Sequence, residues 1–166
     1  MNSFAYFIDS PFGKLVLRAK DESLCECRRA DGVEVLEPVA RSESAVLREA
    51  GLQLARYFEG ELRAFDLPIA QPGTPFQQEV WQALLGIPFA DTVTYAQLAE
   101  RIGRDASSSR AVGSANGANK VAIVVPCHRV VPAVGGVGGY AGGSDMKAAL
   151  LQHEGSHTPL FTMQSS

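Results

Sequence analysis

Hydrophobic and polar positions follow two different periods along the chain. Residues 4–8 and 14–19 are short β-prone runs, and the turn-forming residues 9–13 between them predict a hairpin. Residues 23–28 predict a third strand. Residues 42–58 carry apolar side chains at the spacing of an amphipathic helix. The chain therefore begins with a predicted small sheet and one helix packed on it.

A Gln-Pro-Gly linker at 71–73 predicts a boundary between two domains, residues 1–72 and 73–166. Directly after the linker, Thr74 has the features of a helix N-cap. Proline follows it at the first helical position, and Gln77 stands where a capping box requires a Glu or Gln. The second domain is therefore expected to open with a helix.

Two short helices are predicted next, with the spacing of a helix-turn-helix. Thr94 is expected to cap a helix that reaches about Ile102. A serine among residues 107–109 is expected to cap the next helix, which reaches about Gly117. The last predicted helix spans residues 144–154. The predicted fold class is α+β, a small sheet-and-helix domain followed by a mostly helical domain.

The apolar run at residues 121–128 ends in Pro-Cys-His and predicts a buried strand with a thiol at its end. Six glycines lie between Gly135 and Gly143, where the backbone can approach a ligand closely. A thiol beside an imidazole favours nucleophilic chemistry. A Cys-His pair alone is more often structural, however, so the rest of the chain must decide.

Composition limits the compartment and the cofactors. The chain has 166 residues, of which 46% are hydrophobic, and no apolar stretch is long enough to span a bilayer. Three cysteines without an export signal indicate reduced thiols and a cytoplasmic protein. Three histidines and no Cys-x-x-Cys pair argue against a zinc site. We therefore expect no metal, no cofactor and no membrane association.

Charge is distributed unevenly. The formal net charge of −3 weighs against nucleic-acid binding. Residues 1–72 hold nine Lys/Arg and twelve Asp/Glu, whereas residues 73–166 hold six of each, so the acidity belongs to the first domain. Residues 94–120 hold four basic and two acidic residues. A locally positive face on the helix-turn-helix is therefore compatible with the composition.

Between residues 74 and 155 a set of motifs occurs in a specific order: Tyr95, Arg-Ala-Val-Gly at 110–113, Asn119, Pro-Cys-His-Arg-Val-Val at 126–131, Gly-Tyr-Ala-Gly-Gly at 139–143, Lys147 and Glu154. In this combination the chain resembles the O6-alkylguanine-DNA alkyltransferases. The resemblance implies a ribonuclease H-like first domain and a second domain that binds DNA and accepts the alkyl group.

The resemblance also implies the chemistry. Cys127 would accept the alkyl group of an O6-alkylguanine in DNA in one irreversible transfer, so the protein acts once. His128 would receive the thiol proton through a bridging water, and Glu154 would hold the tautomer of His128. Tyr95 would provide a proton for the departing guanine. No cofactor enters this reaction.

A base inside a duplex cannot reach the thiol, so the resemblance implies that the nucleotide is flipped out. Arg110 would fill the vacated place while its helix lies in the minor groove. The other residues that the resemblance assigns to DNA are Ser109, Ala111, Gly113 and Tyr95. Those assigned to the flipped base are Val130, Tyr140, Ala141 and Lys147, and Asn119 is assigned to a structural hinge.

The partner implied is alkylated double-stranded DNA, bound by a protein that is a monomer in solution. Cooperative assembly on DNA and activity on O4-alkylthymine stay open. Many members of the family carry serine where this chain has Ala141, which leaves the range of alkyl groups open as well.

Three other functions compete with alkyl transfer. A cysteine hydrolase or amidase would use the same thiol, imidazole and carboxylate but leaves the helix-turn-helix unexplained. A module that only recognises damaged DNA would resemble the alkyltransferase-like proteins, which replace the reactive cysteine, whereas that cysteine is present here as Cys127. A transcription factor is disfavoured because a helix of small side chains offers few groups for reading the major groove.

Overall fold

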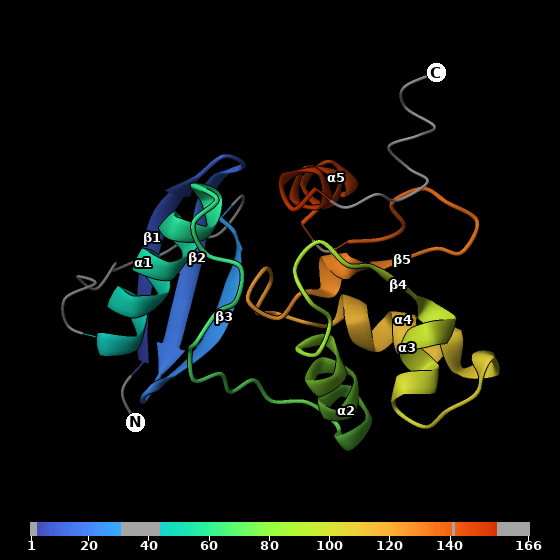
Figure 1. Cartoon of the computed structure of the whole chain (residues 1–166). Coiled ribbons are helices and arrows are strands. Elements are labelled where there is room, and N and C mark those ends of the chain that lie inside the picture. Colours follow the sequence, from blue (N-terminus) through green and yellow to red (C-terminus); the bar gives the residue numbers. More distant parts are fainter. Residues whose placement is uncertain (1–2, 31–43, 141, 156–166) are drawn as a thin grey trace. The chain divides into compact units, whose positions relative to one another are not determined.

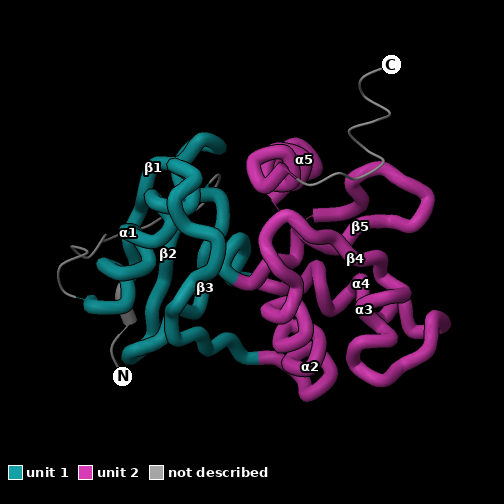
Figure 2. Tube along the Cα trace, viewed as in Figure 1, with its two compact units in different colours: residues 1–72, 120–124 teal, residues 73–119, 125–166 magenta. Residues whose placement is uncertain are grey.

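The computed structural model describes residues 3–30, 44–140 and 142–155. The chain divides into two compact units, drawn in teal and magenta in Figure 2. The first comprises Met1–Pro72 and Lys120–Val124, and the second comprises Gly73–Asn119 and Val125–Ser166. This grouping differs from a single boundary after Pro72 in one respect, because the short segment 120–124 packs with the first unit.

The first unit is built on a three-stranded antiparallel sheet (Figure 1). Its strands, in spatial order, are β1 (Ser3–Ser10), β2 (Gly13–Lys20) and β3 (Ser23–Arg29). The hairpin and the third strand predicted from the sequence are confirmed, with each strand slightly longer than expected. At the β1–β2 turn the Ser10 hydroxyl donates to the carbonyl of Gly13, whose φ of +99° suits glycine.

Helix α1 (Ala45–Phe58) packs against all three strands. Its N-cap is Ser44, whose side chain accepts a hydrogen bond from the backbone N–H of Leu47. The predicted start at residues 42 and 43 lies outside the described residues. Leu47, Leu54 and Tyr57 point from one face of the helix into the core and are fully buried.

The outer edge of β3 is covered by two segments that are distant in sequence. Residue Leu24 exchanges backbone hydrogen bonds with segment 68–70, at 2.8 and 3.0 Å. Cys27 does the same with segment 120–122, at 2.8 and 2.9 Å. These contacts satisfy backbone groups that an edge strand would otherwise expose.

The prediction of a buried strand over residues 121–128 is wrong. Val121 forms a single bridge to β3, after which the chain turns, and Ile123 adopts a φ of +72°. Cys127 then begins a 3-10 helix, η3 (Cys127–Arg129). The apolar side chains of this run are buried, and an apolar run by itself does not distinguish a strand from a buried turn.

The second unit is mostly helical. Helix α2 (Pro75–Leu84) begins with the predicted capping box, in which Thr74 and Gln77 each bond the other's backbone. Helix α3 (Tyr95–Arg101) begins with a second box, between Thr94 and Gln97. In each box the threonine side chain accepts from the backbone N–H of the glutamine, and the glutamine side chain accepts from the backbone N–H of the threonine. These two hydrogen bonds fix where the helix starts.

The helix-turn-helix consists of α3, a 3-10 turn η2 (Ala106–Ser108) and α4 (Ser109–Gly117), with α2 packed against both helices. The predicted serine cap of α4 is wrong. Ser108 occupies the N-cap position without a side-chain hydrogen bond. The turn is capped instead by Asp105, which accepts from the N–H and the hydroxyl of Ser107. A carboxylate one turn earlier thus replaces the expected hydroxyl.

Two short elements connect this motif with the end of the chain. Strand β4 (Val93–Thr94) pairs in parallel with β5 (Val130–Val131), which directly follows η3. Helix α5 (Ser144–His153) ends one residue earlier than predicted, so that Glu154 is its C-cap residue. Within the described ranges, no helix combines the length and apolarity needed to cross a membrane.

Candidate active site

The 3-10 helix η3 places three consecutive side chains in the interior of the second unit. Cys127, His128 and Arg129 are all buried, and Cys127 as a whole residue is only 5% exposed. A 3-10 turn points successive side chains in different directions. The thiol and the imidazole therefore belong to one turn without being stacked on each other.

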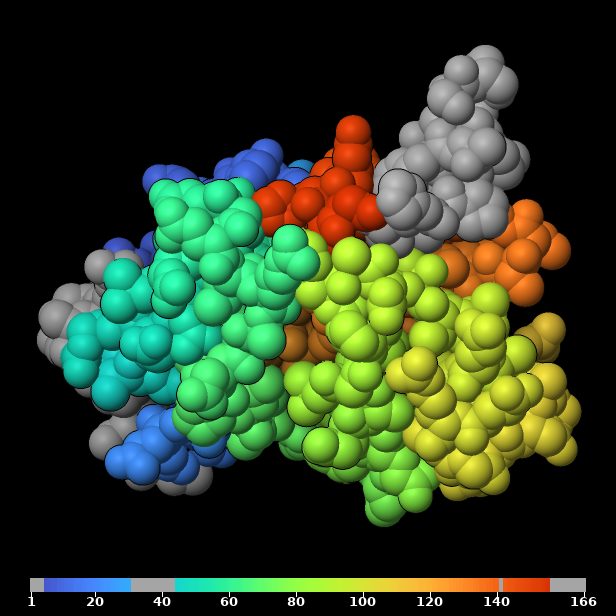
Figure 3. Space-filling model, viewed as in Figure 1, coloured from blue at the N-terminus to red at the C-terminus, as the bar shows by residue number. Residues whose placement is uncertain are grey.

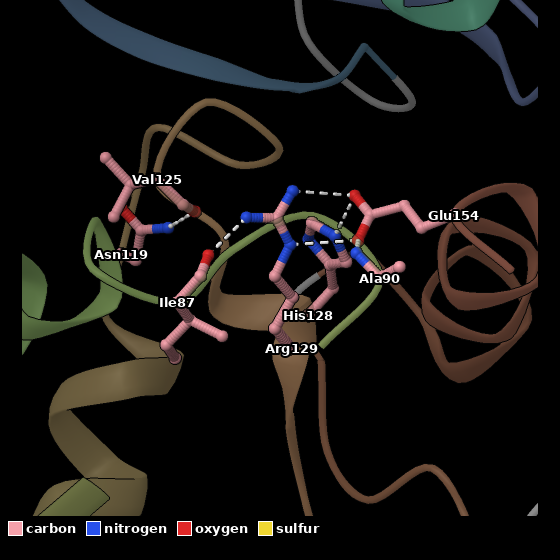
Figure 4. A network of polar contacts seen from close by, with 7 residues as sticks. All are labelled: Ile87, Ala90, Asn119, Val125, His128, Arg129 and Glu154. Atoms are coloured by element: carbon pink, nitrogen blue, oxygen red, sulfur yellow. Dashed lines mark hydrogen bonds and ion pairs between the residues drawn. The ribbon is translucent and has the colours of Figure 1, made fainter. Parts of the chain in front are cut away.

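His128 and Glu154 form a buried hydrogen-bonded pair between η3 and the end of α5 (Figure 4). The distance from His128 Nε2 to Glu154 Oε2 is 2.8 Å, and both side chains are fully buried. An ionised carboxylate only accepts hydrogen bonds, so Nε2 carries the ring proton in the neutral imidazole. Among the described residues Nδ1 has no hydrogen-bond partner, which leaves its lone pair available as a base.

The two groups have shifted pKa values. Burial alone would raise the pKa of Glu154, but the hydrogen bonds and charges of His128 and Arg129 outweigh it and hold that pKa well below its usual range. Burial lowers the pKa of His128, with a further contribution from the charges of Arg129 and Lys147, while Glu154 opposes the shift. The resting pair is therefore a carboxylate and a neutral imidazole.

Arg129 is the member of this network that sequence reasoning missed. Its Nε donates to Glu154 Oε1 and its Nη2 to Glu154 Oε2, both at 2.9 Å. Its Nη1 donates to the Ile87 carbonyl at 2.6 Å. A carboxylate at the C-terminus of a helix is unfavourable next to the helix dipole. That placement of Glu154 is the sequence signal that calls for a nearby cation.

Asn119 hydrogen-bonds the segment before the thiol. Its Nδ2 donates to the Val125 carbonyl at 2.9 Å. Burial raises the pKa of the Cys127 thiol, against which a hydrogen bond with the Asn119 side chain and the charge of Lys147 act. Asn116, on α4, donates to the Cys127 carbonyl at 3.3 Å. Two asparagines therefore fix the backbone that carries the thiol.

Lys147 and Tyr95 approach the same region from α5 and α3. The Lys147 side chain is fully buried, and its Nζ donates to the Gly139 carbonyl at 3.2 Å. Nζ also lies 6.0 Å from the centre of the Tyr95 ring. Burial lowers the pKa of Lys147 to about 8, while the charge of Cys127 acts in the opposite direction. Burial and the charge of Cys127 raise the pKa of Tyr95.

The glycine loop contacts this cluster closely. A Cβ at Gly138 would lie 3.1 Å from the Tyr95 hydroxyl and 3.0 Å from the ring of Pro132, and Gly138 has a φ of +78°. A side chain at Gly142 would meet the ring of Tyr140 at 2.9 Å. Val130 is buried in β5. Ala141 lies outside the described residues.

Helix α4 presents a face of small side chains and one cation. Arg110 and Ala111 are exposed, whereas Ser109 and Gly113 are partly buried. A Cβ at position 113 would lie 3.5 Å from the Tyr95 ring, an ordinary van der Waals distance, so Gly113 faces that ring. Within the described part of the chain, no hydrogen bond or ion pair engages the Arg110 side chain. In Figure 3 the yellow segment around residues 100–110 lies at the surface.

The other cysteines lie in the first unit. Cys25 and Cys27 are free and belong to β3. Burial raises the pKa of Cys27 to about 12, so this thiol stays protonated at neutral pH. Among the described residues no group of three or more His, Cys, Asp or Glu side chains is arranged to hold a metal ion.

Family models match both parts of the chain. Residues 4–71 match the ribonuclease-like domain of 6-O-methylguanine DNA methyltransferase, and residues 75–156 match its DNA-binding domain. The chain belongs to the 6-O-methylguanine DNA methyltransferase family. Its α+β fold, expected from the resemblance, is confirmed.

Relatives in this family match over most of the chain. A methylated-DNA–protein-cysteine methyltransferase of Methanosarcina acetivorans is 45% identical over 151 residues, which covers 89% of this chain and 96% of that protein. Another from Salmonella typhimurium is 55% identical over 104 residues, which covers 62% of this chain and 60% of that protein. The chain thus spans nearly the whole length of its archaeal relative.

Solved structures of the 6-O-methylguanine DNA methyltransferase family have the same fold. The Mycobacterium tuberculosis O6-methylguanine methyltransferase has a TM-score of 0.82 and 39% identity, covering 99% of this chain and 100% of that one. A structure of Mycobacterium tuberculosis OGT in complex with DNA has a TM-score of 0.81 and 42% identity, covering 91% of this chain and 92% of that one.

Proposed function

We propose that this protein repairs O6-alkylguanine in DNA by direct reversal, with Cys127 as the alkyl acceptor. The observation that carries the proposal is the buried Cys127 next to the His128–Glu154 pair, in a chain that matches the family over both units. The relatives named above are methylated-DNA–protein-cysteine methyltransferases. The enzyme is a suicidal methyltransferase that acts once per molecule.

In the proposed reaction the Cys127 sulfur attacks the alkyl carbon in line with the leaving oxygen. The S–C bond forms as the bond between carbon and the guanine O6 breaks. The thiol proton moves to His128 Nδ1 through a water, and Glu154 stabilises the imidazolium that results. Tyr95 donates a proton to the departing guanine, and the proton held by His128 then returns through solvent to the Tyr95 phenolate, so that both side chains regain their starting states. In net terms the alkyl group moves to sulfur and one hydrogen moves to guanine.

The thioether product explains why turnover is not expected. A C–S bond in a thioether is inert, and cleaving it would need a second nucleophile and an activated leaving group. The proposal assigns the surroundings of the flipped base to Val130, Tyr140, Ala141 and Lys147. Assays with O4-alkylthymine and with guanines that carry bulky O6-alkyl groups test whether the protein accepts those substrates.

We further propose that α4 binds the minor groove of alkylated double-stranded DNA and that Arg110 replaces the flipped nucleotide. Arg110 is exposed on α4 without a carboxylate engaging it among the described residues, and the neighbouring Ala111 is small. Such a face allows close approach to the groove and insertion of one cationic side chain. The related Mycobacterium tuberculosis protein has been solved in complex with DNA.

A stoichiometry assay tests the proposed function. Duplex DNA containing O6-methylguanine is incubated with the protein and then hydrolysed, and the bases are separated by chromatography. We expect O6-methylguanine to be converted to guanine at one equivalent per protein, with no conversion by Cys127→Ser or on a second addition of DNA. Repeated turnover would contradict the proposal. Hydrolysis of esters or amides by the protein would support the alternative function, a cysteine hydrolase or amidase.

The role of Arg110 has its own test. Arg110→Ala should slow repair of alkylated duplex while leaving the reaction with free O6-methylguanine base unchanged, because only the duplex requires flipping. The matched control is Arg104→Ala, which removes an exposed arginine ion-paired with Glu79 at 3.5 Å, in the turn before α4. Equal loss on duplex and free base in Arg110→Ala would exclude the flipping role.

We also place the protein in the cytoplasm, as a monomer in solution. Its three cysteines are free, which suits a reducing compartment. Gel filtration at low micromolar concentration should give the mass of one chain, 17.7 kDa. Elution as a dimer would contradict this assignment, and titration with DNA of increasing length would test cooperative assembly.

A further inference from the structure

The buried guanidinium of Arg129 has a defined position beside the pair that the proposed reaction uses. We infer that Arg129 is a positioning residue: it fixes the orientation and charge of the Glu154 carboxylate and thereby the site of the proton on the His128 ring. The inference rests on the proposed function and assigns a residue to it that acts through Glu154, without touching the substrate.

The geometry leaves Arg129 and Glu154 little freedom. The guanidinium donates to both carboxylate oxygens at 2.9 Å in a fork arrangement, and its third contact, to the Ile87 carbonyl, anchors it to the segment after α2 (Figure 4). The guanidinium also lies 5.9 Å from the centre of the Phe89 ring. Bidentate pairs of this kind fix the plane of the carboxylate as well as its charge.

The orientation of the Glu154 carboxylate determines which of its oxygens accepts a hydrogen bond from His128. Glu154 Oε2 is shared between Arg129 Nη2, at 2.9 Å, and His128 Nε2, at 2.8 Å. Because the carboxylate is held ionised, it accepts from Nε2 and cannot donate to it. The ring proton is therefore placed on Nε2, and Nδ1 keeps the lone pair that the thiol proton needs.

Arg129 also balances the charge of Glu154. The charged or titratable groups that act on His128 are Glu154 and Lys147 from α5 and Arg129 from its own turn, and Cys127 precedes it in the chain. Without Arg129, the buried Glu154 charge would be compensated mainly by a proton on His128. An imidazolium has no lone pair, so it cannot accept the thiol proton.

A nuclear magnetic resonance titration tests the inference on the full chain without DNA. The protein is labelled with ¹⁵N-histidine, and the His128 signals are identified by their loss in His128→Asn. The ¹⁵N shifts separate the Nε2–H tautomer, the Nδ1–H tautomer and the imidazolium. In the wild type we expect the Nε2–H tautomer at neutral pH and a midpoint below that of an exposed histidine.

Two variants alter the guanidinium. In Arg129→Met we expect the titration midpoint of His128 to rise by about one pH unit or more, which corresponds to a tenfold or larger change in the protonation equilibrium. In Arg129→Lys we expect a smaller rise, because a lysine keeps the charge but not the fork. The control is Arg18→Met, which removes an arginine paired with Glu26 at 2.6 Å in the first unit.

The same variants are assayed for methyl transfer from O6-methylguanine DNA under single-turnover conditions across pH. The acid limb of the rate profile should move to higher pH by the shift seen in the titration, whereas Arg18→Met should match the wild type. If Arg129→Met does not fold, the results for Arg129→Lys test the inference. Unchanged tautomer, midpoint and profile in a folded Arg129 variant would overturn the inference. Absence of transfer by the wild type would instead overturn the proposed function.

Discussion

Replacing Lys147 with methionine should make the protein more stable at neutral pH. The Lys147 ammonium is fully buried and has a pKa of about 8, against an ordinary value of 10.5. A difference of this size corresponds to about 3 kcal/mol by which burial disfavours the charged form in the folded protein. Loss of the hydrogen bond to the Gly139 carbonyl offsets about 1 kcal/mol. Lys147→Met should therefore gain about 2 kcal/mol at pH 7.

The gain should disappear at alkaline pH. Between the folded pKa of about 8 and the unfolded pKa near 10.5, the unfolded chain binds more protons at Lys147 than the folded protein. The free energy of unfolding of the wild type therefore rises with pH across that window, as far as Lys147 contributes to it. The destabilisation is fully present below pH 8 and mostly gone by about pH 10. The Lys147 charge lowers the pKa of Cys127 and of His128, so these two groups titrate differently in the variant. Groups that Lys147 does not influence are common to both proteins and cancel in the difference.

Urea unfolding of the wild type and Lys147→Met at pH 7 and pH 10 provides the assay, with circular dichroism as the readout. The control is Lys20→Met, which replaces an exposed lysine at the end of β2 and should change stability little at either pH. A variant that is less stable than the wild type at pH 7, with a gap that does not change with pH, would refute the reasoning.

Three further predictions concern stability. Trp81→Phe should lower the free energy of unfolding by about 1–3 kcal/mol, since the buried Nε1–H donates to the Ala115 carbonyl at 2.9 Å; urea unfolding measures it, and no change would show that the bond is dispensable. Thr74→Ala should lower it by about 1 kcal/mol through loss of the capping box, whereas Thr92→Ala, in the loop before β4, should have a smaller effect. On acidification below about pH 6.5 the wild type should lose stability, because the lowered pKa of His128 leaves the unfolded chain binding more protons; the loss should be smaller in His128→Asn, and equal pH dependence in both would exclude His128 as its source.

Much of the fold was predictable because its signals are local. The Ser10–Gly13 turn, the two capping boxes and the glycine after α5 act within a few residues, so the sequence shows them directly. The hairpin, the third strand and the helix starts after Thr74 and Thr94 were predicted correctly for this reason.

The wrong or missing predictions concern segments whose structure depends on residues far away in the sequence. Segment 121–125 is apolar because it packs in the interior, and its one bridge to β3 involves Cys27, almost a hundred positions earlier, so the run alone resembled a strand. The role of Arg129 depends on Glu154 and Ile87, which lie 25 and 42 positions away in sequence. The pairing of His128 with Glu154 was proposed from the resemblance, and the structure places these side chains 2.8 Å apart.

The central claim is that Cys127 accepts the alkyl group, and peptide mass spectrometry tests it most directly. The protein is incubated with duplex DNA that carries one O6-methylguanine and is then digested and analysed. The account predicts one added methyl group on the peptide that contains Cys127, at one equivalent per protein, and none in Cys127→Ser. An unmodified Cys127 peptide after demonstrated binding of the DNA, or a methyl group on Cys25 or Cys27 instead, would contradict it.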